Sequence, residues 1–171
     1  MTQFDLDTLP RICTDLADSF PTVQALSEPK LQQLRRTLTA ADLLPRSAGR
    51  AYHQLTAQDA AVLCTGLALQ PLGKSSVVQV KALLVATSAA GLTFGDALAQ
   101  HLAPTDNRAV RGFEIEVSFY EPHAKIIYRD GSQTVFGEDV RTPVHTSSRL
   151  SAPLLAWFYD RLTPVADATW G

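Results

Sequence analysis

Five basic side chains gather in one short stretch of this sequence, between residues 27 and 53. They are Lys30, Arg35, Arg36, Arg46 and Arg50. Only Glu28 and Asp42 oppose them, so the stretch has a local charge of +3, whereas residues 1–26 contain four aspartates and one arginine. Lysine and arginine bind phosphate groups by charge and hydrogen bonding, so a basic patch beside acidic flanks predicts a phosphate-binding surface. The alternative interpretation is an ordinary solvated helix face.

Amide and aromatic side chains accompany these cations. A helix with basic and amide side chains fits the major groove of duplex DNA, where arginine pairs with guanine and glutamine with adenine. A basic ribbon beside such a helix binds phosphates or the minor groove. The predicted DNA-binding residues are Lys30, Gln32, Gln33, Arg35 and Arg36 on a helix, and Arg46, Arg50, Tyr52 and His53 after it.

Patterns that would indicate an enzyme are weaker. Gly73-Lys74-Ser75 resembles the end of a phosphate-binding loop, but the first glycine of that motif would fall at Ala68, within a helical pattern. The four histidines lack metal-ligand spacing. We therefore predict no catalytic residue, no metal and no cofactor. The histidines are His53, His101, His123 and His145.

The two cysteines, Cys13 and Cys64, lie in apolar helical patterns and form no CxxC motif. Core packing is the favoured interpretation, and a nucleophilic Cys64 paired with His53 or His101 is the alternative. No apolar run is long enough to span a membrane, and the first residues do not resemble a secretion signal. These features predict a cytoplasmic protein.

The elements that would position the basic residues are helices. Leucines and alanines at three- and four-residue spacing predict helices ending before Pro21 and near Leu43, the second beginning after Ser27 with Leu31, Leu34 and Leu38 inward. After a loop or short ribbon over residues 46–56, Thr56 and Asp59 form a capping pattern for a third helix. A fourth helix is expected from about residue 76 to Gly91, and a fifth from Thr93 to Leu102.

This order of elements carries a family resemblance. The matching segments are LTAADLLPR (38–46), GRAY (49–52), LTAQDAAVL (55–63) and PLGKSSVVQVKALL (71–84). Together they resemble the winged helix-turn-helix DNA-binding domain of the MerR family of bacterial regulators. There, a recognition helix ends in a Gly-Leu-Leu-Pro-like turn and a wing follows. About twenty-five residues precede the recognition-helix candidate here, and the long dimerisation helix of that family is missing. The same stretch also resembles small regulators of prophages and gene-transfer elements.

The second half of the chain has a different pattern. Residues 113–119 alternate apolar and polar side chains, residues 124–129 and 132–136 continue as strands, and Asp130-Gly131 is a hairpin turn. These features predict a three-stranded antiparallel meander, which the final helix over residues 152–162 would cover. Glu114, Glu116 and Glu121 are expected on its polar face rather than as acid-base catalysts. The strand aromatics are expected in the core, because the sheet is too acidic to stack nucleic acid bases.

The sequence therefore predicts an α+β protein with two domains. Residues 1–103 would form a helical winged helix-turn-helix of about five helices, and residues 104–171 a β-meander with one helix. The first functional hypothesis is a DNA-binding transcriptional regulator that acts on double-stranded DNA. It would form a homodimer, or bind a protein partner, through residues 113–162. The alternative is a non-enzymatic adaptor of a phage or another assembly, in which both halves bind protein.

Overall fold

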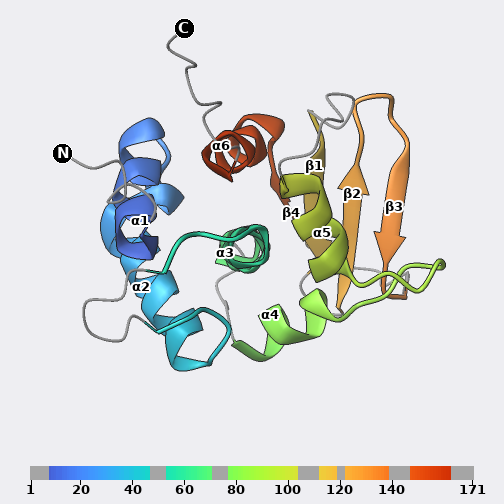
Figure 1. Ribbon diagram of the computed structural model, residues 1–171. Coiled ribbons are helices and arrows are strands. Elements are labelled where there is room, and N and C mark those ends of the chain that lie inside the picture. The colour runs from blue at the N-terminus through green and yellow to red at the C-terminus, as the bar shows by residue number, and fades with distance from the viewer. Residues whose placement is uncertain are drawn as a thin grey trace, which may run out of the picture.

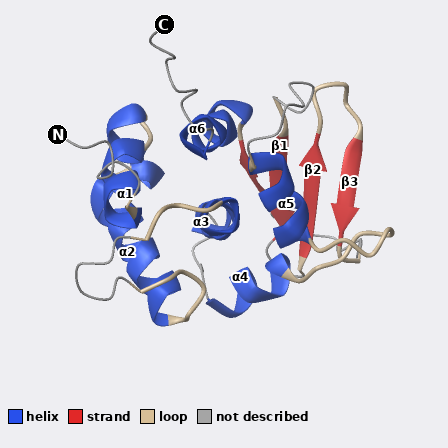
Figure 2. Cartoon of the chain, in the orientation of Figure 1, coloured by secondary structure: helices blue, strands red, loops and turns tan. Residues whose placement is uncertain are grey.

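The computed structural model describes residues 8–46, 53–70, 77–103, 112–118, 122–138 and 147–162. Within these ranges, helices α1 to α5 precede a four-stranded sheet, and α6 follows it (Figure 1). The chain is therefore α+β, as the sequence predicts. Figure 2 shows the helices α1 and α2 on one side of α3, and the sheet on the other.

Helices α1 (Leu9–Ser19) and α2 (Glu28–Ala40) are joined through the short 3₁₀ helix η2 (Gln24–Leu26). Their buried faces are those that the leucine spacing predicts. Ser27 stands at the N-cap position of α2, but its side chain makes no capping hydrogen bond. The buried residues are Leu9, Ile12, Cys13 and Leu16 on α1, and Leu31, Leu34 and Leu38 on α2.

Helix α3 (Ala57–Leu69) passes through the centre of the molecule, and every residue from Asp59 to Leu69 is buried. The predicted capping box is present. The Thr56 hydroxyl accepts a hydrogen bond from the Asp59 backbone N–H, and the Asp59 carboxylate accepts one from the Thr56 backbone N–H. This reciprocal pairing satisfies the backbone N–H groups of Thr56 and Asp59 at the start of a helix that is apolar all round.

Gly66 allows α2 to pack closely against α3. A Cβ atom at this position would lie 3.0 Å from Leu34 Cδ1 and 3.3 Å from Leu38 Cδ1. We expect Gly66→Val to push α2 outward and to lower the free energy of unfolding by about 1–3 kcal/mol, the usual cost of overpacking a core. Urea unfolding followed by circular dichroism measures this change, and an unchanged midpoint would contradict the close packing of α2 on α3.

Helix α4 (Val77–Leu84) is shorter than predicted, and α5 (Phe94–Leu102) begins at the predicted Thr93 cap. Thr87 and Thr93 form an antiparallel bridge, and the Phe94 backbone N–H donates to the Ala86 carbonyl over 2.8 Å. Gly91, with a φ of +80°, lies within this turn. The prediction that α4 extends to Gly91 is therefore wrong, because its last turn gives way to a hairpin-like connection.

The sheet has four strands rather than the predicted three. Strands β1 (Glu114–Ser118), β2 (His123–Ile127) and β3 (Gln133–Phe136) form the expected meander. Strand β4 (Ser147–Leu150) pairs antiparallel with β1 and gives the order β3-β2-β1-β4. The prediction missed β4 because four residues reading SSRL contain one apolar side chain and no alternation.

The two faces of the sheet differ as the alternation predicts. Glu114 and Glu116 on the outer face form ion pairs with Arg149 of β4, at 3.3 and 2.8 Å. The inner face packs mainly on α3, and Phe94 of α5 meets Phe136 of β3 edge to face with ring centroids 5.4 Å apart. The prediction that the final helix covers the sheet is therefore wrong. Helix α6 (Ala152–Leu162) packs on α5 and α3 instead.

One apolar core connects the two predicted domains. Its buried residues come mostly from the helical half, up to Leu102, and also from the segment from Phe113 through β1 to β4 and α6. The division at residue 103 stays a prediction, but this shared core favours a single folding unit. Of the helices that the structure describes, none has both the length and the apolar character needed to cross a bilayer.

Candidate functional site

Helix α2 presents a basic and amide stripe to solvent. Lys30, Gln33 and Arg36 are exposed, and Ala40 continues the stripe by one turn. At about 100° per residue, Gln33, Arg36 and Ala40 lie on the side of the helix opposite to the buried leucines, and Lys30 lies at the edge of that side. Because α1 and α3 support α2 from behind, the helix offers a rigid cationic edge to a partner. Thr37, half-buried beside Arg36, also borders this stripe.

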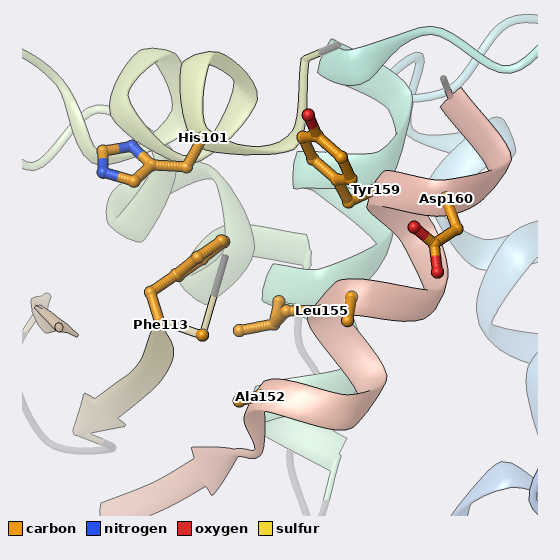
Figure 3. Close-up of a pocket in the computed structure, with 8 residues that line it drawn as sticks. His101, Phe113, Ala152, Leu155, Tyr159 and Asp160 are labelled. Atoms are coloured by element: carbon orange, nitrogen blue, oxygen red, sulfur yellow. The ribbon is translucent and has the colours of Figure 1, made fainter. Parts of the chain in front are cut away.

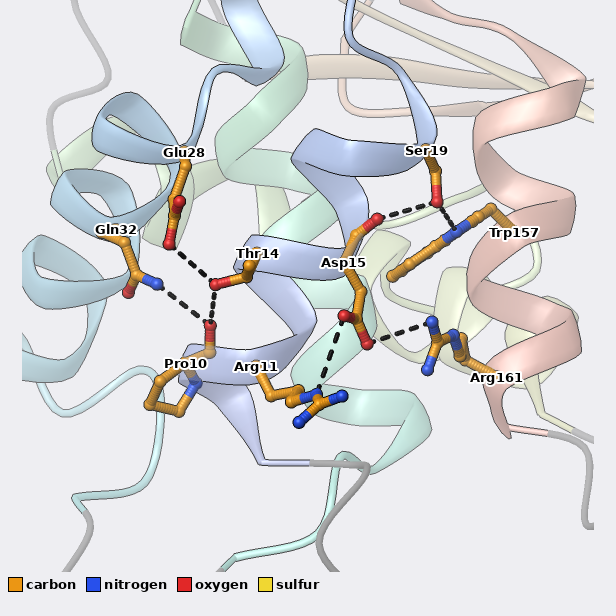
Figure 4. A network of polar contacts seen from close by, with 9 residues as sticks. All are labelled: Pro10, Arg11, Thr14, Asp15, Ser19, Glu28, Gln32, Trp157 and Arg161. Carbon is orange, nitrogen blue, oxygen red and sulfur yellow. Dashed lines mark hydrogen bonds and ion pairs between the residues drawn. The ribbon is translucent and has the colours of Figure 1, made fainter.

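Two of the predicted contact residues, Gln32 and Arg35, point toward α1 instead. The Gln32 amide donates to the Pro10 carbonyl over 3.0 Å, and Arg35 Nε donates to the Gln32 side-chain oxygen over 3.0 Å. Both side chains are half-buried. Figure 4 shows Gln32 reaching the first turn of α1, beside the 2.8 Å hydrogen bond from the Thr14 hydroxyl to Glu28. These contacts fix the orientation of α2 on α1.

Helix α2 ends in a Schellman motif. The Leu43 backbone N–H donates to the Leu38 carbonyl over 3.0 Å, and the Asp42 N–H donates to the Thr39 carbonyl over 3.1 Å. Asp42 adopts a left-handed conformation with a φ of 59°, where glycine is the usual residue. Its carboxylate pairs with Arg46 over 2.9 Å. One of the predicted cationic groups is thereby partly neutralised.

Replacing Asp42 tests this turn. We expect Asp42→Gly to raise the free energy of unfolding by about 0.5–1 kcal/mol, because glycine removes the penalty of a left-handed side chain. The exposed ion pair lost with Arg46 offsets only a few tenths of a kcal/mol. Thermal unfolding measures the change. Asp42→Ala serves as the control, since alanine removes the same charge but keeps the strain, and equal stabilisation by both would exclude the backbone explanation.

The segment after α2 returns to the core at the start of α3. His53 Nε2 lies 3.1 Å from Asp59 Oδ2, the carboxylate oxygen that also accepts from the Thr56 hydroxyl over 2.8 Å. Gln54 forms an antiparallel bridge with Thr8. His53 is thus exposed but tied to the capping box of α3. Two further predicted contact residues, Arg50 and Tyr52, lie outside the described residues.

The C-terminal helix braces α1. Arg161 of α6 lies 3.1 Å from Asp15 of α1, and the Trp157 indole N–H donates to the Ser19 hydroxyl over 2.9 Å. Arg11 approaches the same aspartate at 3.7 Å. Figure 4 shows these contacts on the other side of α1 from its contacts with α2. The sequence has no local signal for the contacts between α1 and α6, because their partners are more than a hundred residues apart.

A small pocket of about 100 Å³ lies where α5, β1 and α6 meet (Figure 3). Phe113, Leu155 and Tyr159 form much of its wall, and His101 lies at its edge. His101 Nδ1 is 2.7 Å from the Ala97 carbonyl and Nε2 is 3.1 Å from the Tyr128 hydroxyl. Since both ring nitrogens have structural partners, the arrangement does not present a general base to a substrate.

Both cysteines are buried, as predicted for core residues. Burial raises the pKa of Cys13 to about 11, and its thiol lies 3.8 Å from the Leu31 carbonyl. Burial also raises the pKa of Cys64, which is fully enclosed in α3. A thiol with a raised pKa carries little thiolate at neutral pH, so neither cysteine is activated as a nucleophile. The described residues contain no group of histidine, cysteine and carboxylate side chains that could hold a metal ion.

Comparisons of the chain with protein-family models, with curated proteins and with solved structures find no match. The site must therefore be interpreted from its own geometry and charge.

Proposed function

We propose that this protein binds double-stranded DNA as a transcriptional regulator. In this proposal, α1 and α2 form a helix-turn-helix and α2 is the recognition helix. The chain between α2 and α3 is the wing of a MerR-like winged helix. The observation that carries the proposal is the exposed stripe of Lys30, Gln33 and Arg36 on a helix held from behind by two others.

The side-chain chemistry of this stripe suits the major groove. An α-helix fits into that groove, arginine can bond both acceptors of guanine, and glutamine can pair with adenine. Lys30, near the start of the helix, is placed to contact a phosphate. Gln32 and Arg35 would act indirectly, because their hydrogen bonds hold α2 on α1. The Schellman turn at Asp42 supports the proposal too, since the resemblance implies a Gly-Leu-Leu-Pro-like turn where this chain has Asp-Leu-Leu-Pro.

The net charge of −2 limits the range of the attraction. Binding should depend on a local patch, so it should weaken steeply with salt. The test is fluorescence polarisation of a labelled random-sequence duplex titrated with the full chain at about 50 and 200 mM salt. We expect saturable binding at the lower salt and a loss of at least about tenfold in affinity at the higher. No binding at the lower salt would overturn the proposal and leave the protein adaptor as the remaining hypothesis.

A further inference from the structure

The exposed face of α4 has two large apolar side chains in contact with solvent. They are Val78, which is 74% exposed, and Val85, which is 67% exposed. Val23, which lies far from α4 in the sequence, is 42% exposed. Val78 and Val85 are seven residues apart, and the Val85 N–H donates to the Lys81 carbonyl, so the helical turn continues to Val85. The two most exposed valines therefore lie on one face, two turns apart.

An open hollow of about 580 Å³ adjoins this face. Ala82, Val85 and Ala86 form its helical side, and Pro122, Gly137 and Glu138 form the side that belongs to the sheet. The two exposed valines thus form a ridge beside a hollow whose lining is also mainly apolar. Isolated exposed valines need no explanation, but an aligned pair next to an apolar hollow is typical of a contact surface.

The charges on this surface are complementary. Lys81 is the one charged residue of α4 and is exposed, and Glu138 is the one charged residue that lines the hollow. A surface that has a ridge, a hollow, one cation and one anion can match a copy of itself across a twofold axis, where each contact occurs twice.

We propose that two copies of this chain associate through α4, antiparallel about a twofold axis near Lys81 and Ala82. Val78 of each copy then packs against Val85 of the other. Glu138 borders Val85, and Lys81 follows Val78 by one turn, so Lys81 of each copy pairs with Glu138 of the other. Ala82 lies near the axis, where its small side chain allows the helices to approach closely. This self-association is independent of DNA binding.

The interface is small. An eight-residue helix is about 12 Å long, so the contact falls short of the roughly 800 Å² per partner found in stable complexes. We therefore expect a reversible dimer with a Kd on the order of 10–100 µM. Two copies held on neighbouring sites would gain from this contact through their raised effective concentration.

Sedimentation velocity of the full chain from about 5 to 500 µM tests the proposal, because this range brackets the expected Kd. Wild type should shift from monomer to dimer across the range. Val85→Glu should stay monomeric, and the matched control Val23→Glu should dimerise like wild type. Lys81→Glu and Glu138→Lys should each weaken the dimer at least about threefold, and the double swap K81E/E138K should restore it.

Three results would overturn the proposal. They are a wild type that stays monomeric at the highest concentration, a dimer that Val85→Glu leaves intact, and a double swap that weakens association further. The first would assign the valine face to a different partner. Circular dichroism of each variant checks that it is folded. All four substituted positions are exposed, so the variants should fold.

Discussion

The double variant K30A/R36A should lose at least about 30-fold in affinity for duplex DNA at low salt. Lys30 and Arg36 are the exposed cations of α2, and a lost phosphate or base contact costs about 1–3 kcal/mol each. Stability should change by less than about 0.5 kcal/mol, because both side chains lie on the solvent face, away from the leucines. Polarisation titrations and urea unfolding measure the two quantities.

The matched control is K125A/R129A, which removes the same number of positive charges from the sheet. If general attraction drives binding, both double variants should weaken it equally. Our proposal expects the control to stay within about threefold of wild type, since its charges lie far from α2. Equal losses in the two variants would contradict a DNA interface on α2. Arg35→Ala should behave differently from Arg36→Ala, because it breaks the hydrogen bond to Gln32 and lowers stability as well.

A fragment of residues 1–103 should fail to unfold cooperatively. Cutting after residue 103 removes the partners that bury α3 and α5, including the fully buried Ile115, Ile126, Phe136 and Phe158. Each large apolar side chain contributes about 1.5–3 kcal/mol when buried, and a domain is stable by only about 5–15 kcal/mol in total. Phe94, Leu98 and Leu102 would also lose their cover.

Far-ultraviolet circular dichroism during thermal unfolding measures this outcome, with the full chain as the reference. We expect a broad, weak transition from the fragment and a sharp one from the full chain. A sharp transition from the fragment would show that the helical half folds alone, as the separate apolar patterns of the two halves suggest. The shared core would then be a docking contact between two domains.

Sequence patterns predicted the fold well where one element has one buried face. The leucines of α2, the capping box of α3 and the alternation in β1 each determine which side chains are inside, and the structure agrees. Patterns failed where contacts from distant residues decide. Strand β4 forms because its backbone completes the edge of β1, and α3 rather than α6 makes the main helix contacts with the sheet. Neither the pairing of β4 with β1 nor the choice of the helix that covers the sheet can be predicted from the residues of those segments alone.

The candidate site was likewise predicted only in part. Charge and spacing identified α2 as the basic helix, yet they could not separate exposed Gln33 and Arg36 from half-buried Gln32 and Arg35. That separation depends on the Pro10 carbonyl of α1, which only the packed structure brings near. Likewise, nothing in the sequence connects His53 with Asp59, or Arg161 with Asp15.

The most direct test of DNA binding through α2 is a backbone amide chemical-shift map of the full chain with a duplex of about 20 base pairs at low salt. We predict that the largest shifts belong to Lys30, Gln33, Arg36 and their neighbours on α2, that they shrink as salt is added, and that amides of β1 to β4 stay nearly unchanged. Shifts concentrated on the sheet or on α4, or no salt-sensitive shifts at all, would contradict the account.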